Sequence, residues 1–292
     1  MVKGWTKRLE FWLNQPDVKE HPLRAFWRRV LWRVHFMLRP GEPLVLNNWY
    51  RGMRIALPRS GSAASTFYRG HSNVHIVRAM EERLRPGDIV LDVGAHIGEY
   101  TLIAARLVGA QGKVYAIEPQ PKAVEAIGLN ARLNGLENIR IRELALADAT
   151  GTMSFYSDAR SWGGFLAPNG TRTSLRVRCT TLDGFVEEEG IPRVDFIKLD
   201  AAGNEKAVLL GGKSLLSSSA APVLVFKFYH PQVVQERFGY EARKTVELLA
   251  SWGYRMEVLA EEGRIPLSAA NCYEFFSDVT YGLPVLAWRE DE

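Results

Sequence analysis

An acidic residue and two glycines follow a short apolar run in residues 89–100. Apart from Asp92, Ile89–Val93 is aliphatic and mostly β-branched. It follows the turn signal of residues 86–88, and the two features together predict a buried parallel strand. Gly94 and Gly98 allow a sharp turn and a close approach of the backbone to a ligand. The spacing Asp-x-Gly-x-x-x-Gly, which begins at Asp92, differs from the dinucleotide pattern G-x-G-x-x-G. The strand-end acid favours a cationic or hydroxyl-bearing ligand over a pyrophosphate.

Three more acids stand at or just beyond the ends of predicted strands, namely Glu118, Asp148 and Asp200. Ligands of open parallel sheets bind beyond the carboxyl ends of the strands. Glu118 lies 20 residues after Gly98, which is the separation at which an acid accepts hydrogen bonds from ribose hydroxyls. Each acid alone could cap a helix or sit in a turn, but the four together favour a nucleoside cofactor.

The elements that must position these acids alternate regularly between strand and helix from residue 86 onward. This alternation predicts an α/β fold with a mostly parallel sheet and helices on both faces. Two further strands, 151–156 and 175–179, should form a hairpin around the loop 158–173. The strands are expected at 89–93, 113–117, 139–144, 194–199, 223–228, 255–259 and 273–277, and the helices at 74–84, 101–107, 122–134, 182–188, 204–216 and 241–251.

Length and composition predict a globular protein, since the 292 residues are 47% hydrophobic and 24% charged. The only two cysteines, Cys179 and Cys272, provide neither a disulfide framework nor a metal cluster, which favours a reducing cytosol. No signal peptide and no uncharged run long enough to span a membrane is visible. We therefore expect a cytoplasmic protein.

Positively charged residues and tryptophans are concentrated near the N-terminus. Residues 1–85 hold 16 Lys and Arg against 6 Asp and Glu, although the whole chain carries a net charge of only +4. Five of the eight tryptophans also precede residue 60. We expect a basic, aromatic-rich extension over residues 1–73, with short strand-like pieces at 44–46 and 53–57 and a loop at 59–65, followed by a ligand-binding domain over residues 74–292.

Residues 22–38 form the clearest amphipathic helix. Its apolar positions follow helical spacing, and they are Leu23, Phe26, Trp27, Val30, Leu31, Val34 and Leu38. The simplest interpretation is a helix that packs on its own domain through this face. A second is peripheral attachment to an anionic membrane, because arginine with tryptophan and phenylalanine is typical of interfacial helices. Nucleic-acid binding is a third, but the chain has no RRM, KH or zinc-finger pattern, so nucleic acid is an unlikely partner.

Several segments, in order along residues 75–230, resemble the FkbM-type methyltransferases, which are class I enzymes that use S-adenosylmethionine. The resembling segments are 91–100 (LDVGAHIGEY), 116–119 (AIEP), 129–134 (LNARLN), 145–148 (ALAD) with Gly151, 181–183 (TLD), and 196–200 (FIKLD) with Gly203 and Glu205. The resemblance implies a Rossmann-like sheet of seven strands with an antiparallel edge. It also implies methyl transfer to a hydroxyl of a sugar, glycolipid or secondary metabolite.

The resemblance assigns roles to the strand ends. The turn 94–98 would wrap the methionine part of the cofactor, and Glu118 would hold its ribose. Residues 145–148 would lie near the adenine, and Lys198 and Asp200 would face the methyl-transfer side. The cofactor-binding residues implied are Asp92, Gly94, Ala95, His96, Gly98, Tyr100, Thr101, Glu118, Pro119, Ala145, Ala147, Asp148 and Asp200.

The chain departs from the family pattern at three positions. Ala202 stands where the family has an acid, Lys227 stands where it has a glutamate, and His96 replaces a common asparagine. Loss of two carboxylates and gain of a lysine disfavours a divalent-metal mechanism, since hard cations need carboxylate oxygens. These departures leave open that the chain is a non-catalytic binding protein with this fold. The basic N-terminus leaves a second alternative open, a nucleic-acid methyltransferase.

Methyl transfer to a hydroxyl needs in-line placement of the reacting atoms and an acceptor for the proton. Our hypothesis assigns the proton to Asp200 or His96, assisted by Lys198 or His230. His96 has the most suitable ordinary pKa, near ~6.5, although it could equally cap the turn. The acceptor pocket is expected to come from the loops 59–73 and 158–173, and the oligomeric state is not predicted.

Overall fold

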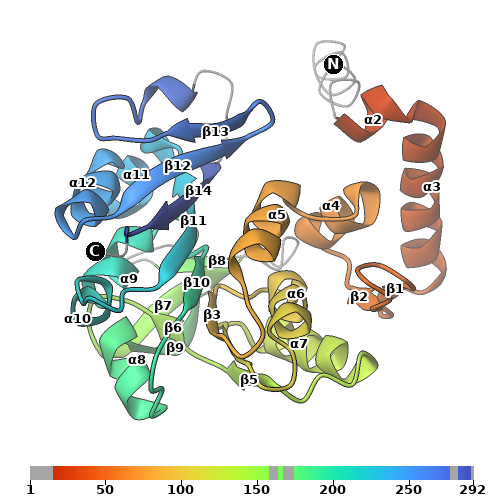
Figure 1. Ribbon diagram of the computed structural model, residues 1–292. Coiled ribbons are helices and arrows are strands. Elements are labelled where there is room, and N and C mark those ends of the chain that lie inside the picture. Colours follow the sequence, from red (N-terminus) through yellow and green to blue (C-terminus); the bar gives the residue numbers. More distant parts are fainter. Residues whose placement is uncertain (1–15, 158–163, 167–173, 277–281, 291–292) are drawn as a thin grey trace. The chain divides into compact units, whose positions relative to one another are not determined.

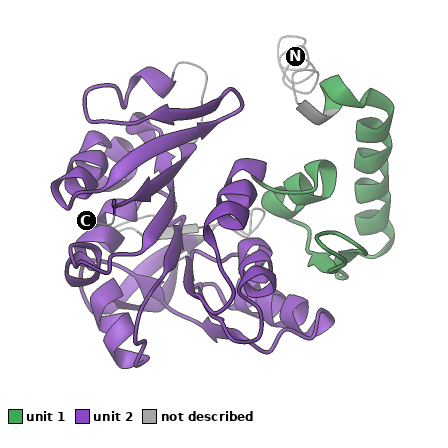
Figure 2. Ribbon diagram, viewed as in Figure 1, with its two compact units in different colours: residues 1–72 green, residues 73–292 purple. Residues whose placement is uncertain are grey.

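The computed structural model describes residues 16–157, 164–166, 174–276 and 282–290 of the chain. It divides into two compact units, residues 1–72 and 73–292 (Figure 2). Among the described residues, no helix combines the length and the apolar character needed to cross a bilayer.

The first unit contains three helices and a small antiparallel ribbon among its described residues. Helix α2 (Pro16–Glu20) is followed by the long helix α3 (Pro22–Leu38), which begins with a proline in its first turn as predicted. Strand β1 (Leu44–Leu46) pairs with β2 (Ile55–Leu57), and helix α4 (Gly61–Arg69) completes the unit.

The predicted loop over 59–65 is wrong, because most of it lies in α4. Ser60 caps this helix, and its hydroxyl accepts a hydrogen bond of 3.2 Å from the backbone N–H of Ala63. Ala63 and Phe67 are buried on one face. The glycine and serines of this segment suggest a loop, whereas the serine cap and the buried face favour a helix.

The second unit is built on an eight-stranded sheet (Figure 1). Its order is β13-β12-β14-β11-β10-β3-β4-β5, and the pairs from β11 to β5 are parallel. Helices α5 to α7 cover one face of this sheet and helices α8 to α12 cover the other. The strands are β3 (Ile89–Val93), β4 (Lys113–Ile117), β5 (Ile139–Arg142), β10 (Phe196–Leu199), β11 (Val223–Tyr229), β12 (Arg255–Ala260), β13 (Gly263–Pro266) and β14 (Gly282–Trp288).

This arrangement confirms the predicted α/β class and the mostly parallel sheet with an antiparallel edge. The sheet has one strand more than the seven expected, because β13 pairs with β12 as an extra antiparallel edge strand. The helices are α5 (Val74–Arg83), α6 (Glu99–Val108), α7 (Pro121–Leu133), α8 (Leu182–Glu188), α9 (Glu205–Leu210), α10 (Lys213–Leu216), α11 (Pro231–Phe238) and α12 (Arg243–Ser251).

A second sheet of four strands, in the order β6-β9-β7-β8, includes the predicted hairpin. Strand β7 (Gly151–Ser157) pairs antiparallel with β9 (Ser174–Thr180), and β6 (Ala145–Leu146) lies parallel to β9. Strand β8 (Gly164–Leu166) falls within the predicted loop 158–173. The rest of that loop, to which we assigned part of the acceptor pocket, lies outside the described residues.

The last predicted strand, 273–277, is wrong. Residues Glu274–Phe276 form a short 3-10 helix, and Phe276 is buried against Phe228 with 5.4 Å between the ring centroids. The strand is β14 instead, and Pro284 obscures it in the sequence because proline is rare within sheets. The pairing of β14 with β12 covers residues 285–288, so Pro284 faces only β11.

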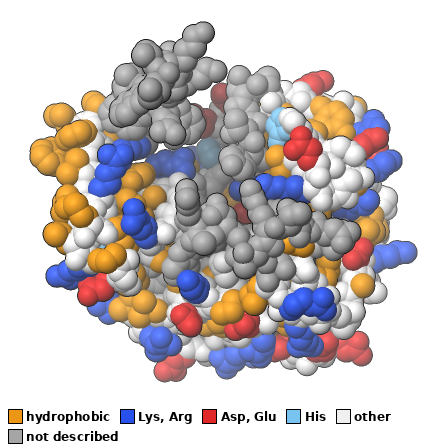
Figure 3. Space-filling model, turned by 180° about the vertical axis from the view of Figure 1, so that it is seen from behind, with side chains coloured by type: hydrophobic (Ala, Val, Ile, Leu, Met, Phe, Trp, Pro, Cys, Tyr) orange, Lys and Arg blue, Asp and Glu red, His pale blue; other side chains and the backbone are white. Residues whose placement is uncertain are grey.

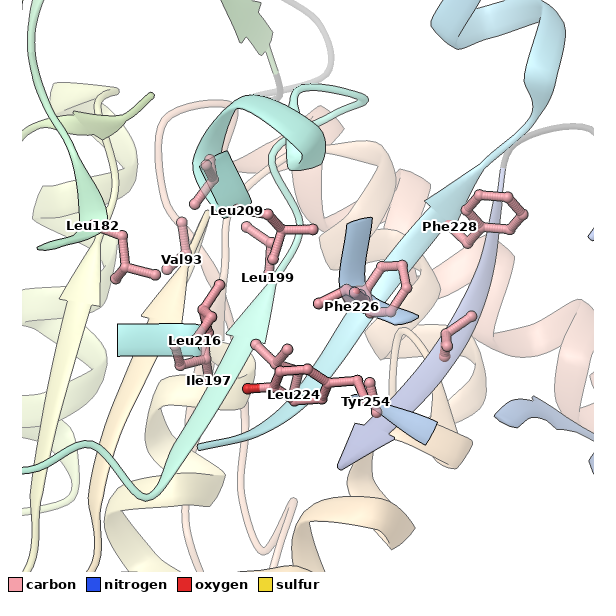
Figure 4. Packing of buried hydrophobic residues seen from close by; sticks show 14 of the residues in the cluster. Val93, Leu182, Ile197, Leu199, Leu209, Leu216, Leu224, Phe226, Phe228 and Tyr254 are labelled. Carbon is pink, nitrogen blue, oxygen red and sulfur yellow. The ribbon is translucent and has the colours of Figure 1, made fainter. Parts of the chain in front are cut away.

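The main core lies between the central strands and the helices α8 to α12 (Figure 4). All four residues of β10 are buried, and Ile197 and Leu199 point into this core together with Leu224 and Phe226 of β11. Leu216 packs against them from α10. This packing fixes the carboxyl ends of β3, β10 and β11 beside one another, where the predicted site residues lie.

Candidate functional site

A buried ion pair holds the base of the glycine turn. Asp92 of β3 and Lys198 of β10 are partners across the two parallel strands, and 3.0 Å separates Lys198 Nζ from Asp92 Oδ1. Thr101 of α6 donates a 2.6 Å hydrogen bond to Asp92 Oδ2. Asp92 and Thr101 are therefore bound to each other, and Asp92 also to Lys198, so they hold the turn in place. Their contact with the cofactor stays a prediction.

The ammonium group of Lys198 also donates to backbone oxygens of the turn, at 2.7 Å to Gly94 O and 3.3 Å to Val93 O. Burial alone would lower the pKa of Lys198, but the charges of Asp92 and Asp200 outweigh it and raise that pKa. A charged, buried lysine that is bound to the turn has a positioning role. The predicted assistance of Lys198 in proton transfer does not fit this geometry.

The glycine turn requires glycine for two reasons. Gly94 has a φ of +72°, and a Cβ on it would lie 2.0 Å from the backbone oxygen of Asp200. Gly98 has a φ of +86° and precedes the first residue of α6. Non-glycine residues rarely adopt this conformation, yet His96, which lies between the two glycines, has a φ of +52°. The turn predicted from the sequence is therefore present, with three left-handed residues.

Glu118, at the end of β4, joins this turn. Its Oε2 accepts a 2.9 Å hydrogen bond from the backbone N–H of His96, and its Oε1 accepts one of 3.0 Å from the N–H of Gln120. Burial raises the pKa of Glu118 to about 7, although both hydrogen bonds act in the opposite direction. Each carboxylate oxygen can accept more than one hydrogen bond, so Glu118 retains acceptor capacity for a ligand.

Apart from Asp92 Oδ1, which lies 3.0 Å from Lys198 Nζ, two buried side-chain atoms near these strand ends have no hydrogen-bond partner among the described residues. They are Oε1 of Gln120, which follows Glu118 and Pro119, and Nδ2 of Asn204, which precedes α9. Buried polar atoms are normally paired, and those left unpaired mark places where a ligand or water completes the structure. Sequence reasoning missed both residues, although Gln120 directly follows the predicted AIEP segment.

Asp200, at the end of β10, receives groups from β11. Tyr229 Oη donates a 2.7 Å hydrogen bond to Asp200 Oδ1, and Lys227 Nζ lies 3.7 Å from Oδ2. Burial alone would raise the pKa of Asp200, but the charges of Lys227 and Lys198 and the Tyr229 hydrogen bond together lower it. A charge on His96 contributes in the same direction. Asp200 is therefore a stable carboxylate in contact with a phenol and an ammonium group.

Tyr229 was missed by sequence reasoning, and Lys227 was noted only as a departure from the family pattern. The signal was present, because residues two apart on a strand point to the same face and both lie at the carboxyl end of β11. Burial raises the pKa of Tyr229 well above its ordinary value, so its phenol stays protonated and acts as a donor.

Glu205 holds the loop that follows Asp200. Its Oε1 accepts hydrogen bonds from the backbone N–H groups of Ala201 at 2.7 Å and Gly203 at 3.3 Å. Burial and the charge of Asp200 raise the pKa of Glu205 to about 8. Ala202, where the family pattern has an acid, lies in this loop with a φ of +56°. The loop is therefore fixed from inside by a neutral carboxyl group at neutral pH.

The remaining predicted residues have varied positions. Ala95 and Tyr100 are buried beside the turn, and burial raises the pKa of Tyr100 well above its ordinary value. Ala145 and Ala147 are buried in the second sheet, and Asp148 is exposed, so their contact with adenine stays a prediction.

His230, a predicted catalytic residue, caps a helix. Its Nδ1 accepts a 3.2 Å hydrogen bond from the backbone N–H of Gln232 at the start of α11, and its ring packs against Phe276. This is the structural alternative to the predicted catalytic role. Among the described residues, no group of three or more His, Cys, Asp or Glu side chains could hold a metal ion.

Comparison with known proteins identifies one family for most of this region. Residues 92–256, more than half of the chain, match the family model described as Methyltransferase FkbM domain. This match begins at Asp92 and includes the glycine turn, Glu118, Asp200 and Tyr229.

Three curated relatives are similar to about half of the chain. The 31-O-demethyl-FK506 methyltransferase FkbM of Streptomyces tacrolimicus is 30% identical over 44% of this chain and 60% of its own length. The 2-O-methyltransferase NoeI of Sinorhizobium fredii is 25% identical over 46% and 61%. The hexuronic acid methyltransferase AglP of Haloferax volcanii is 27% identical over 51% and 59%. The chain thus spans about three fifths of the length of these relatives.

Proposed function

The chain belongs to the FkbM methyltransferase family, and on that premise we propose that it transfers a methyl group from S-adenosylmethionine to a hydroxyl oxygen. The acceptor class proposed is a sugar, a glycolipid or a secondary metabolite. Two of the relatives are named for O-methylation and a third for methylation of a hexuronic acid, which supports this choice.

The observation that carries the proposal is the link between Glu118 and the glycine turn through His96. It places a carboxylate with free acceptor capacity beside a backbone turn that admits no Cβ at Gly94. The unpartnered Oε1 of Gln120 adds a second buried acceptor. The hydroxyls and amines of a nucleoside are the donors that such acceptors fit. Glu118, Gln120 and the turn would therefore hold the cofactor, which supplies an electrophilic methyl carbon on its sulfonium sulfur when bound.

In the acceptor half, Asp200 orients the hydroxyl that is methylated. A carboxylate whose pKa is lowered by Lys227, Lys198 and Tyr229 is a weak base, but it is a good hydrogen-bond acceptor. We assign the proton to the neutral imidazole of His96, because a positive charge on its ring would lower the pKa of Asp200, so the ring lies near this carboxylate. Tyr229 and Lys227 keep Asp200 ionised and in place.

Calorimetry with S-adenosylmethionine and transfer of a labelled methyl group to sugar and uronic-acid hydroxyls test the proposal. Asp200→Asn should lower transfer at least tenfold and leave cofactor affinity nearly unchanged, since the turn and Glu118 remain. His96→Ala should also reduce transfer, whereas the exposed Glu236→Gln on α11 should not. Wild-type transfer rates in both site variants would contradict the assigned roles.

The same measurements separate the alternatives. Binding of S-adenosylmethionine without transfer to any hydroxyl would favour a binding protein that keeps the fold, as Ala202 and Lys227 suggest. Binding to RNA or DNA that weakens steeply with salt would favour a nucleic-acid methyltransferase. We propose the cytoplasm as the compartment, which the buried and unpaired Cys179 and Cys272 support, and cell fractionation would test it.

A further inference from the structure

Helix α3 packs on its own unit through the face opposite to the one predicted. Ala25, Trp32 and Phe36 are its buried residues, and the Trp32 ring lies 5.5 Å from that of Phe67 in α4. Arg28 donates two 2.9 Å hydrogen bonds to the backbone oxygens of Phe67 and Tyr68. The helix therefore packs on its own unit, as the simplest interpretation predicts, but not through its seven-residue apolar face.

The apolar face itself points outward. Leu23 is 77% exposed, Trp27 59% and Leu31 56%. Of the thirteen large apolar side chains that are exposed among the described residues, seven belong to this single helix, namely Leu23, Phe26, Trp27, Leu31, Val34, Met37 and Leu38. Hydrophobic side chains gather at the left edge of Figure 3, which is the right edge of Figure 1, where α3 lies. An exposed apolar surface of this extent normally marks an interaction site.

Arginines border this face on both sides. At 3.6 residues per turn, the seven exposed apolar residues occupy one continuous arc of roughly 140°. Arg24 and Arg33, both exposed, lie just outside its two margins. The sequence of α3 contains four arginines and no acidic residue. Arg29 stacks on the Tyr68 ring at 4.5 Å, so it belongs with Arg28 to the packed side and not to this face.

The charge pattern decides among the occupants of this surface. A second copy of the chain would bring the Arg24 and Arg33 margins of two helices together, and like charges would repel each other. An anionic bilayer instead accepts the apolar arc at the boundary of its acyl chains and pairs its headgroups with Arg24 and Arg33. Tryptophan within the arc and phenylalanine at its margin are also typical of this interface.

We propose that α3 lies in the plane of an anionic membrane surface, with its exposed apolar arc inserted and with Arg24 and Arg33 bound to lipid phosphates. The helix is long enough for this, since 17 residues span roughly 26 Å along the surface. The proposal concerns the first unit and does not depend on the proposed methyl transfer.

Vesicle flotation of the full-length chain tests the proposal. Vesicles of phosphatidylcholine alone are compared with vesicles in which phosphatidylglycerol replaces part of it. We expect the protein to float with the anionic vesicles and to bind the neutral ones at least tenfold more weakly, and added salt should release it. A protein that stays in solution with both kinds of vesicle, or that binds both equally, would overturn the proposal.

Variants of the outward face locate the contact. Trp27→Glu with Leu31→Glu should lower vesicle binding at least tenfold, and Arg24→Glu with Arg33→Glu should remove the preference for anionic lipid. Ile265→Glu with Leu175→Glu is the matched control, because it places the same two charges on exposed apolar positions outside α3, in β13 and β9. Circular dichroism and thermal unfolding should be unchanged in all of them, since Trp32 and Phe36 are untouched. Equal flotation of the Trp27 variant and the control, or a dimer in solution that the Trp27 variant dissociates, would show that the membrane assignment is wrong.

Discussion

Lys198 and Asp92 form an ion pair of 3.0 Å across two neighbouring parallel strands, and the side chains of both are less than 5% exposed. The pair ties β10 to the glycine turn, since the same ammonium group donates to Gly94 O and Val93 O. The chain thus uses a buried charge to set the geometry of a backbone turn that is proposed to hold the cofactor.

Replacement of Lys198 by methionine should destabilise the protein strongly, because it leaves the buried carboxylate of Asp92 unpaired. Breaking a buried pair in this way costs about 3–5 kcal/mol of the free energy of unfolding. Adding Asp92→Asn should restore part of this loss. Urea unfolding of the two single variants and the double variant measures the coupling.

The exposed pair Arg178–Glu188 provides the control. Arg178→Met should change the free energy of unfolding by about 0–1 kcal/mol, as expected for a surface ion pair. Equal losses in Lys198→Met and Arg178→Met would mean that the Lys198–Asp92 pair contributes no more than a surface contact.

How far the sequence predicted this site depends on the kind of information involved. The strand, the glycine turn and Glu118 were predictable because they follow from local patterns, such as β-branched residues before Gly94 and an acid at a fixed distance. The buried ion pair between Asp92 and Lys198 was not predictable, because it depends on the pairing of two strands that are far apart in the chain. The strand 282–288 was missed because Pro284 suggests a loop, and its place next to β11 depends on tertiary pairing.

The faces of α3 illustrate the same limit. Helical spacing correctly predicted the helix and its apolar stripe, but it does not say which face packs. Trp32 and Phe36 pack on α4, while the larger stripe around Trp27 stays exposed. The pKa values of Glu118 and Glu205 were equally beyond the sequence, because burial within the folded chain raises both.

Gly94→Ala should abolish high-affinity binding of S-adenosylmethionine and destabilise the protein. The new Cβ would lie 2.0 Å from Asp200 O, so the turn or the end of β10 must move. Gly135→Ala is the matched control, since Gly135 has a similar φ of +60° but nothing within 4 Å of the added Cβ. The control should lose only about 1 kcal/mol from backbone strain and keep cofactor binding. Calorimetry that shows equal affinity for both variants would exclude a close approach at Gly94.

Cofactor binding should depend on pH through Glu118. Its pKa is about 7 in the structure, and ribose hydroxyls donate best to the ionised form, so affinity should rise as the pH increases through that value. The increase approaches tenfold per pH unit below the pKa and levels off above it. Calorimetry from about pH 6 to about pH 8 checks this. Glu118→Gln should bind more weakly and lose this dependence, and an identical slope in the variant would assign the titration to another group.

Glu205 should make the protein less stable as the pH rises. Its pKa is raised from 4.5 to about 8 on folding, so between these values the folded chain holds a proton that the unfolded chain releases. The contribution of Glu205 to stability is therefore complete below pH 4.5 and is lost as the pH passes about 8, at up to about 1.4 kcal/mol per pH unit. Glu205→Gln keeps an oxygen for the N–H groups of Ala201 and Gly203 but cannot ionise. The stability of Glu205→Gln should equal that of the wild type near pH 4.5 and exceed it near pH 8.

Thermal unfolding of both proteins across this pH range measures the effect of Glu205→Gln. Glu189→Gln is a control of opposite sign, because the hydrogen bond from Arg142 lowers the pKa of Glu189, and its contribution to stability is present above pH 4.5. Glu189→Gln should therefore be less stable than the wild type at neutral pH and approach it in acid. A stability difference between wild type and Glu205→Gln that stays constant with pH would show that Glu205 ionises normally in the folded protein.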